Sequence, residues 1–195
     1  MKYAFYPGCV SRGGCPELYP AAVKVATKLG MELHELRDVG CTGSGVLDQE
    51  VSDPINARTF AKAEKLGADM GQPVTLMTIC STCTGVMSLA NLRLKSDPEY
   101  RARINKEYLA EEGLEYKGTL EIKHMMWAIT EDVGMDAFKA QVKAPLKGLK
   151  ISPFYGCFLR RPSEAVDPTK KRRQSLEDII RGVGAEVVDI TAKSK

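Results

Sequence analysis

The chain has 195 residues, of which 44% are hydrophobic and 27% are charged, and its formal net charge at pH 7 is +3. This composition is typical of a folded protein with a hydrophobic core and excludes a disordered or fibrous chain. So small an excess of positive charge does not support a nucleic-acid partner, because phosphate binding requires clustered basic side chains.

Strand-like and helical hydrophobic patterns alternate along the chain, which is typical of an α/β fold built around a parallel sheet. Strands are predicted at residues 3–6, 32–36, 74–79, 151–154 and 186–190. Helices are predicted at about 18–30, 53–67, 83–95, 100–112, 125–133 and 174–181, and Asp53 is expected to be the N-cap of the second of them.

The first seven residues lack the hydrophobic segment and cleavage site of a secretory signal peptide. The longest stretch without a charged residue, 73–92, contains Gly85 and several polar side chains, so it fits a strand, a tight loop and the start of a helix better than a membrane span. We therefore expect a cytoplasmic protein with no membrane span, in which cysteines stay reduced.

Two segments of the chain resemble each other. Residues 2–12 and 150–160 each contain a strand-like run followed by Gly-Cys, and each is followed by a predicted helix and strand. This predicts a first domain over 1–146 and the start of a second over 147–195. The counterpart of Cys41 would fall within a residue or two of Lys195, so the second unit is incomplete in this sequence, and whether the chain continues is left open.

Four cysteines follow three of the predicted strands: Cys9, Cys41, Cys80 and Cys83. Because parallel strands place their carboxyl ends at one edge of a sheet, we expect these thiols to share one site. The last two form a Cys-x-x-Cys pair at the start of a helix, where free N–H groups and the helix dipole stabilise thiolates. Flanking glycines, including Gly8 and those of the segment 40–45, allow the backbone to approach a bulky anion.

Such thiolates favour an iron-sulfur cluster. Zinc is an alternative, since it also accepts four thiolates. A thioredoxin-like dithiol would explain only Cys80 and Cys83, and buried thiols acting as small hydrophobic side chains would not explain the glycines. Cys15 is interpreted as a loop thiol near the site, and His34 and His124 as structural residues. The basic segment 162–173 is interpreted as a solvated loop, or alternatively as a docking patch for an acidic partner.

These motifs resemble those of the cysteine-rich CCG domain, and most closely those of the B-type subunit of heterodisulfide reductase. The resemblance covers the whole chain and includes residues 6–9, 76–83, 116–124 and 155–164. It implies an α/β parallel-sheet CCG domain, followed by an incomplete second copy that begins near Cys157.

The resemblance also implies a function. The family suggests an oxidoreductase that exchanges electrons with a disulfide or protein-bound sulfane-sulfur substrate as part of a larger complex. Its partners would be the iron-sulfur protein and the flavoprotein of such a complex, similar to the C-type and A-type components of heterodisulfide reductase. The residues that match the first motif are Cys9, Cys41, Cys80 and Cys83, and Cys157 matches the first cysteine of the second.

One departure from the family bears on the cofactor. Thr42 stands where the family has the second residue of a Cys-Cys pair, which argues against a noncubane cluster and favours a 4Fe-4S cluster held by the remaining four thiolates. The segment 147–195 lacks the other cysteines of the second motif, so Cys157 is a ligand only if further residues complete that site. The alternative function is a non-catalytic electron-relay or zinc-binding assembly subunit of the same kind of complex.

Overall fold

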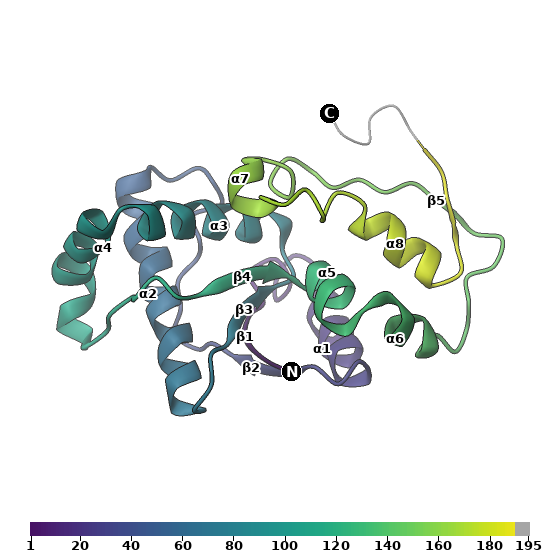
Figure 1. The fold of residues 1–195 in the computed structure, drawn as a ribbon, viewed down its shortest axis with the longest axis horizontal. Coiled ribbons are helices and arrows are strands. Elements are labelled where there is room, and N and C mark those ends of the chain that lie inside the picture. Colours follow the sequence, from purple (N-terminus) through teal and green to yellow (C-terminus); the bar gives the residue numbers. More distant parts are fainter. Residues whose placement is uncertain (190–195) are drawn as a thin grey trace.

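The computed structural model describes residues 1–189 and shows an α/β protein with a parallel sheet at its centre (Figure 1). The four strands are β1 (Lys2–Tyr6), β2 (Glu32–Glu35), β3 (Thr75–Thr78) and β4 (Glu121–His124), in the spatial order β2, β1, β3, β4. Every neighbouring pair in this sheet is parallel. The parallel α/β architecture is confirmed, although β4 was not among the predicted strands.

Helices connect the strands and cover both faces of the sheet. They are α1 (Leu18–Lys28), α2 (Gln49–Asp69), α3 (Ser81–Ser96), α4 (Pro98–Ile104), α5 (Met125–Trp127), α6 (Met135–Ala140), α7 (Ser163–Val166) and α8 (Ser175–Gly182). Shorter π and 3-10 segments occupy Asn105–Leu109, Ala110–Glu112 and Ala128–Val133. The side chain of Asp97 accepts a hydrogen bond from the Tyr100 N–H and caps α4, whose first residue is Pro98, a position that suits proline.

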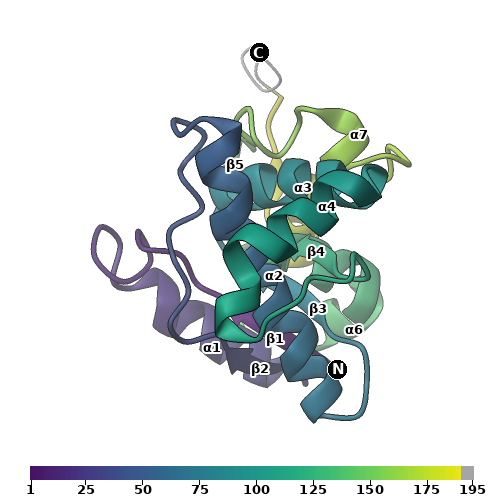
Figure 2. The ribbon, with the colours of Figure 1, turned by 90° about the vertical axis from the view of Figure 1, so that its left-hand side faces the viewer.

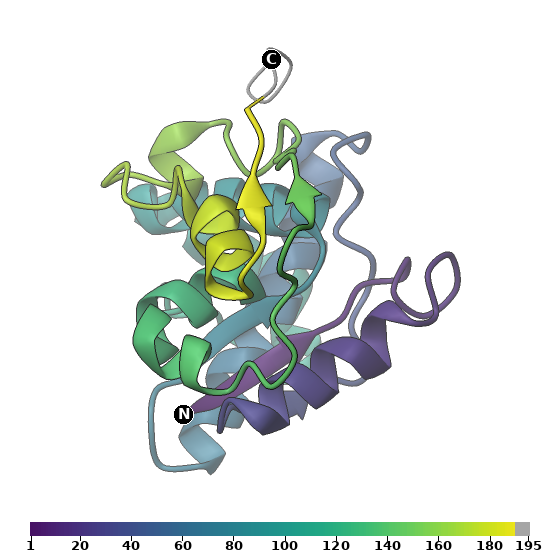
Figure 3. The ribbon, with the colours of Figure 1, turned by 90° about the vertical axis from the view of Figure 1, so that its right-hand side faces the viewer.

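Alternate residues of β1 point into two different hydrophobic cores, as the two-residue period of a strand requires. Ala4 and Tyr6 contribute to the core beneath α2, α3 and α4. Tyr3 and Phe5 contribute to the opposite core, beneath α1, α5 and α6. Figure 2 views the molecule from the side of α2 and α4, and Figure 3 from the side of α8, so that the two helical layers can be compared.

Helix α2 begins earlier than predicted. Its N-cap is Asp48, and Asp53 lies inside the helix with none of its side chain exposed. Asp53 is paired with Arg93 of α3, so the acidic residue before Pro54 serves a tertiary contact and not a helix start. The expected N-cap role of Asp53 is therefore wrong.

The described residues after α6 form a smaller group of elements with its own two-stranded sheet. Strands β5 (Lys150–Ile151) and β6 (Glu186–Val187) pair in parallel, with α7 and α8 between them in the chain. Both strands are shorter than predicted, and residue 190 of the predicted last strand lies outside the described residues. The internal repeat and the boundary at residue 146 remain predictions. Over residues 1–189, none of the helices combines the length and the hydrophobicity that crossing a lipid bilayer requires.

Candidate functional site

The Cys-x-x-Cys pair faces Gly8 across the carboxyl edge of the sheet. Gly8 follows β1 and has a φ of +77°, in the left-handed region that favours glycine. A Cβ atom at this position would lie 3.5 Å from the Cys83 sulfur and 3.6 Å from the Cys80 Cβ. The glycine therefore brings the backbone that leads to Cys9 close to the other two thiols.

Cys80 and Cys83 are placed by the start of α3. Cys80 is the N-cap of this 16-residue helix, and Cys83 lies in its first turn with 6% of its surface exposed. A hydrogen bond with the Cys83 thiol, together with the nearby N–H groups of Cys83 and Thr82, lowers the pKa of Cys80 to about 6, although burial acts in the opposite direction. The same bond and burial raise the pKa of Cys83. The geometry thus favours one thiolate that is stabilised by its partner.

Thr42 is the buried neighbour of this pair. Its side chain is 1% exposed, and its hydroxyl oxygen lies 3.6 Å from the Cys83 sulfur. Its carbonyl oxygen accepts a hydrogen bond from the Asn56 side chain of α2 at 3.1 Å, which holds this part of the loop against the helix. The residue that replaces the expected second cysteine therefore points into the site.

Cys9 and Cys41 are exposed and line the same surface cavity of about 450 Å³, together with Tyr6. The Tyr6 hydroxyl donates a 2.9 Å hydrogen bond to the Gly40 carbonyl oxygen, which ties the loop before Cys41 to β1. Burial, followed by the charges of Cys83, Cys41 and Cys9, raises the pKa of Tyr6. One tyrosine thus lies within electrostatic reach of three of the four predicted thiols.

The structure brings the four cysteines to one edge of the sheet, but their side chains do not converge on a single position. Among residues 1–189, no three His, Cys, Asp or Glu side chains take up positions that would hold a single metal ion. The donor set of thiols, and the close approach that Gly8 permits, nevertheless fit a bulky group bound between the loops.

Three further residues singled out in the sequence lie in local contacts. The Cys15 thiol donates to the Glu17 carboxylate at 3.3 Å. His34 Nε2 lies 2.6 Å from the Glu32 carboxylate. His124 Nδ1 accepts from the Met126 N–H at 3.2 Å and caps α5, and burial lowers the pKa of His124 to about 4.

Residues 3–88, which contain all of the cysteines that line this edge, match the cysteine-rich domain family named CCG. The chain therefore contains a CCG domain. This confirms the resemblance that the cysteine spacing indicated.

Several curated relatives match nearly the whole chain, including the following three. It is 32% identical to the 8-methylmenaquinol:fumarate reductase membrane anchor subunit of Wolinella succinogenes, over 96% of this chain and 63% of the relative. It is 30% identical to the B-type subunit of the ferredoxin:CoB-CoM heterodisulfide reductase of Methanosarcina mazei, over 98% and 63%. It is 28% identical to a protein of Archaeoglobus profundus that is named as similar to the B-type subunit of heterodisulfide reductase, over 95% and 62%. The chain thus spans slightly less than two thirds of the length of these relatives.

Among solved structures, a hypothetical protein from Helicobacter pylori matches with a TM-score of 0.71 and 14% identity, over 100% of this chain and 34% of that one. This likeness concerns the fold alone.

A later segment of the chain packs directly against the CCG domain. Phe158, which follows the exposed Cys157, contacts Gly45 of the loop after Cys41 and Gly85 of α3. A Cβ atom at Gly45 would lie 2.6 Å from the Phe158 ring, and one at Gly85 would lie 2.6 Å from the Phe158 carbonyl oxygen. The sequence shows these glycines as loop and helix residues. Only the fold reveals that together they form the surface, called here the seat, against which Phe158 packs.

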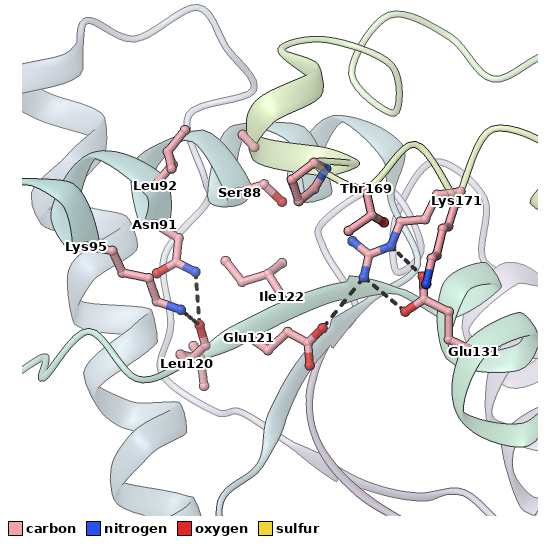
Figure 4. Close-up of a pocket in the computed structure, with 13 residues that line it drawn as sticks. Ser88, Asn91, Leu92, Lys95, Leu120, Glu121, Ile122, Glu131, Thr169 and Lys171 are labelled. Atoms are coloured by element: carbon pink, nitrogen blue, oxygen red, sulfur yellow. Dashed lines mark hydrogen bonds and ion pairs between the residues drawn. The ribbon is translucent and has the colours of Figure 1, made fainter.

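A cavity of about 550 Å³ lies apart from the thiols, between α3, β4 and the basic segment 162–173 (Figure 4). Arg172 lies at its edge with 15% of its side chain exposed, bonded to both carboxylate oxygens of Glu131 at 2.5 and 3.0 Å. Its guanidinium group lies 4.4 Å from the centre of the Trp127 ring. Arg172 therefore anchors this segment to α5 and the π-helical segment that follows it, whereas Lys170, Lys171 and Arg173 are exposed as expected.

Proposed function

We propose that this chain is an iron-sulfur redox subunit of a heterodisulfide reductase-like complex, and that it exchanges electrons with a disulfide or sulfane-sulfur substrate. The observation that carries the proposal is the gathering of Cys9, Cys41, Cys80 and Cys83 at one edge of a sheet, where Gly8 brings the backbone before Cys9 close to the other two thiols. The similarity of the chain to proteins named as, or as similar to, B-type subunits of heterodisulfide reductase supports the choice of reaction.

The proposed cluster ligands are the four cysteines. When bound, the cluster would supply one-electron chemistry beside a sulfur substrate. The residues of the chain prepare the site for it. The start of α3 stabilises negative charge on Cys80, Gly8 lets the backbone before Cys9 approach Cys80 and Cys83, and the Tyr6 hydroxyl fixes the loop that carries Cys41.

Thr42 bears on the type of cluster. Its hydroxyl is a harder and weaker ligand than a thiolate, so we assign it no bond to iron and favour a 4Fe-4S cluster with four cysteine ligands. Its distance of 3.6 Å from Cys83 suits a hydrogen bond to that sulfur, which would stabilise the thiolate form of Cys83.

The proposed partners follow from the proposal that the chain belongs to a heterodisulfide reductase-like complex. Electrons would pass through an iron-sulfur protein and a flavoprotein, similar to the C-type and A-type components of heterodisulfide reductase. Support comes from the names of the relatives, which describe subunits of reductases. Co-purification of the tagged chain with both partners from its source cells is the expected result, and purification of the chain alone would count against this part of the proposal.

The experiment that tests the function is metal and sulfide analysis of protein purified without oxygen, combined with electron paramagnetic resonance. Iron and acid-labile sulfide in a ratio near one support it, whereas stoichiometric zinc or a folded, metal-free protein overturns it. Cys83→Ser should lower the iron content, and Cys15→Ser should leave it unchanged, because the Cys15 thiol bonds to Glu17 and is not among the proposed ligands. Equal loss in both variants would refute the ligand assignment.

A further inference from the structure

The peptide group between Ile79 and Cys80 is held by side chains from two strands. The Cys80 N–H donates a hydrogen bond to the Thr78 hydroxyl oxygen at 3.2 Å. The Ile79 carbonyl oxygen accepts one from the imidazole of His124. Thr78 and His124 are themselves direct partners across β3 and β4. Two residues that face each other at the end of the sheet thus hold the same peptide group.

This peptide lies just beyond the last paired residue of β3, so the sheet does not supply its hydrogen bonds. Buried backbone groups need partners, and here two side chains provide them. The C=O and N–H groups of a trans peptide point in opposite directions, so bonding both of them restricts rotation of the peptide plane. That plane sets the direction in which the Cys80 side chain leaves the backbone.

The protonation of His124 is determined by its contacts. Nδ1 accepts a hydrogen bond from the Met126 N–H at 3.2 Å. A neutral imidazole that accepts at one nitrogen carries its proton on the other, so Nε2–H is the group that donates to the Ile79 carbonyl oxygen. His124 therefore connects the start of α5 to the residue before Cys80.

We propose that Thr78 and His124 are positioning residues for Cys80, which hold its sulfur in the direction required for cluster binding. The Thr78 bond also uses the Cys80 N–H, which leaves the N–H groups of Thr82 and Cys83 to face sulfur. The inference rests on the proposed function only in treating Cys80 as a ligand. The hydrogen bonds themselves are properties of the metal-free chain.

The first test compares Thr78→Val with Thr78→Ser, because valine has the same shape but no acceptor and serine retains the hydroxyl. In metal-free protein, Thr78→Val should raise the exchange rate of the Cys80 amide proton, measured by nuclear magnetic resonance. In protein reconstituted anaerobically with iron and sulfide, it should release iron to a chelator roughly tenfold faster than the wild type. Its paramagnetic resonance spectrum and midpoint potential should also shift, and Thr78→Ser should behave like the wild type in all of these measurements.

The second test separates the two bonds of His124. Gln at this position places a donor near the site of Nε2, whereas Asn places an acceptor near the site of Nδ1. His124→Gln should hold iron as the wild type does and lose thermal stability because the cap of α5 is gone. His124→Asn should keep the cap and release iron faster. Equal rates of iron release from the two variants would overturn the role of His124.

The outcomes distinguish the two proposals. If the wild-type chain takes up no iron and sulfide, the proposed function fails, and the amide-exchange comparison still tests the hydrogen bond. If the wild type binds a cluster and Thr78→Val matches Thr78→Ser in exchange, iron release and spectrum, the positioning role is overturned. Circular dichroism of each variant shows whether the compared proteins are folded.

Discussion

The hydroxyl oxygen of Thr42 lies 3.6 Å from the sulfur of Cys83, although 41 positions separate them in the chain. This contact joins the loop after β2 to the first turn of α3. It also places a non-thiol side chain inside the proposed ligand set, and leads to the first prediction.

Thr42→Cys should add a fifth thiolate to the site and change the paramagnetic resonance spectrum of the reconstituted cluster, because a thiolate binds iron well whereas the Thr42 hydroxyl is assigned no bond to it. Thr42→Ser keeps the hydroxyl and serves as the control, with a spectrum like that of the wild type. Identical spectra for all three proteins would mean that residue 42 does not reach the cluster.

Cys80 should be the thiolate that an alkylating reagent modifies first within the Cys-x-x-Cys pair of metal-free protein. Its pKa is lowered to about 6, so most of it is ionised at pH 7, while the pKa of Cys83 is raised. The rate with iodoacetamide, followed by mass spectrometry of the Cys80 peptide, should fall as the pH drops through about 6. In urea the same transition should move to near pH 8.5. An unchanged transition in the two states would contradict the assigned stabilisation.

Arg93→Leu should destabilise the protein strongly. The Asp53 side chain is completely buried, and it accepts hydrogen bonds from Arg93 Nε at 2.8 Å and from the Tyr100 hydroxyl at 3.2 Å. Removing the arginine leaves a buried carboxylate without its counter-charge, which costs about 3–5 kcal/mol of unfolding free energy. Urea denaturation measures this loss.

Two controls accompany that variant. Adding Asp53→Asn to Arg93→Leu should recover part of the stability, because the uncompensated charge is gone. Lys65→Ala removes an exposed ion pair with Asp69 in α2 and should change the unfolding free energy by no more than about 1 kcal/mol. A similar loss of unfolding free energy for Arg93→Leu and Lys65→Ala would show that burial of the Asp53 pair does not determine the size of the effect.

Gly85→Ala should disturb the contact between α3 and the segment around Cys157. The added methyl group would lie 2.6 Å from the Phe158 carbonyl oxygen and 2.8 Å from its Cβ, so the segment must shift. We expect a loss of about 1–3 kcal/mol in unfolding free energy. Gly14→Ala, where the nearest atom lies at 3.5 Å, is the matched control and should be close to neutral. Combining Gly85→Ala with Phe158→Ala should give less than the sum of the two losses.

The sequence predicted the parallel sheet because three of its strands are hydrophobic runs that end near glycine and cysteine. It did not predict β4, whose residues include Glu121 and Lys123. The Lys123 side chain is only 9% exposed and lies 2.5 Å from the Asp132 carboxylate. Charged residues argue against a buried strand, and the partner that makes this burial possible is known only once the chain has folded.

The candidate site divides in the same way. Placing cysteines after parallel strands was enough to bring Cys9, Cys41, Cys80 and Cys83 to one edge. The role of Thr42, in contrast, depends on a contact between distant loops that no local pattern encodes. The sequence predicts Asp53 as a helix cap because an acidic residue before proline is a typical start signal, whereas its actual partner, Arg93, lies 40 positions away.

The seat that Gly45 and Gly85 make for Phe158 has a practical consequence for dissecting this molecule. A fragment cut at residue 146 would keep every cysteine of the first motif and yet lose the aromatic ring that closes over the loop beside it. The surface around Gly45 and Gly85 that Phe158 covers would be exposed to water, and the loop bearing Cys41 would lose this packing contact. Biochemists who wish to study the N-terminal half in isolation should therefore extend it at least through residue 160, or expect an altered metal-binding behaviour that reflects the cut.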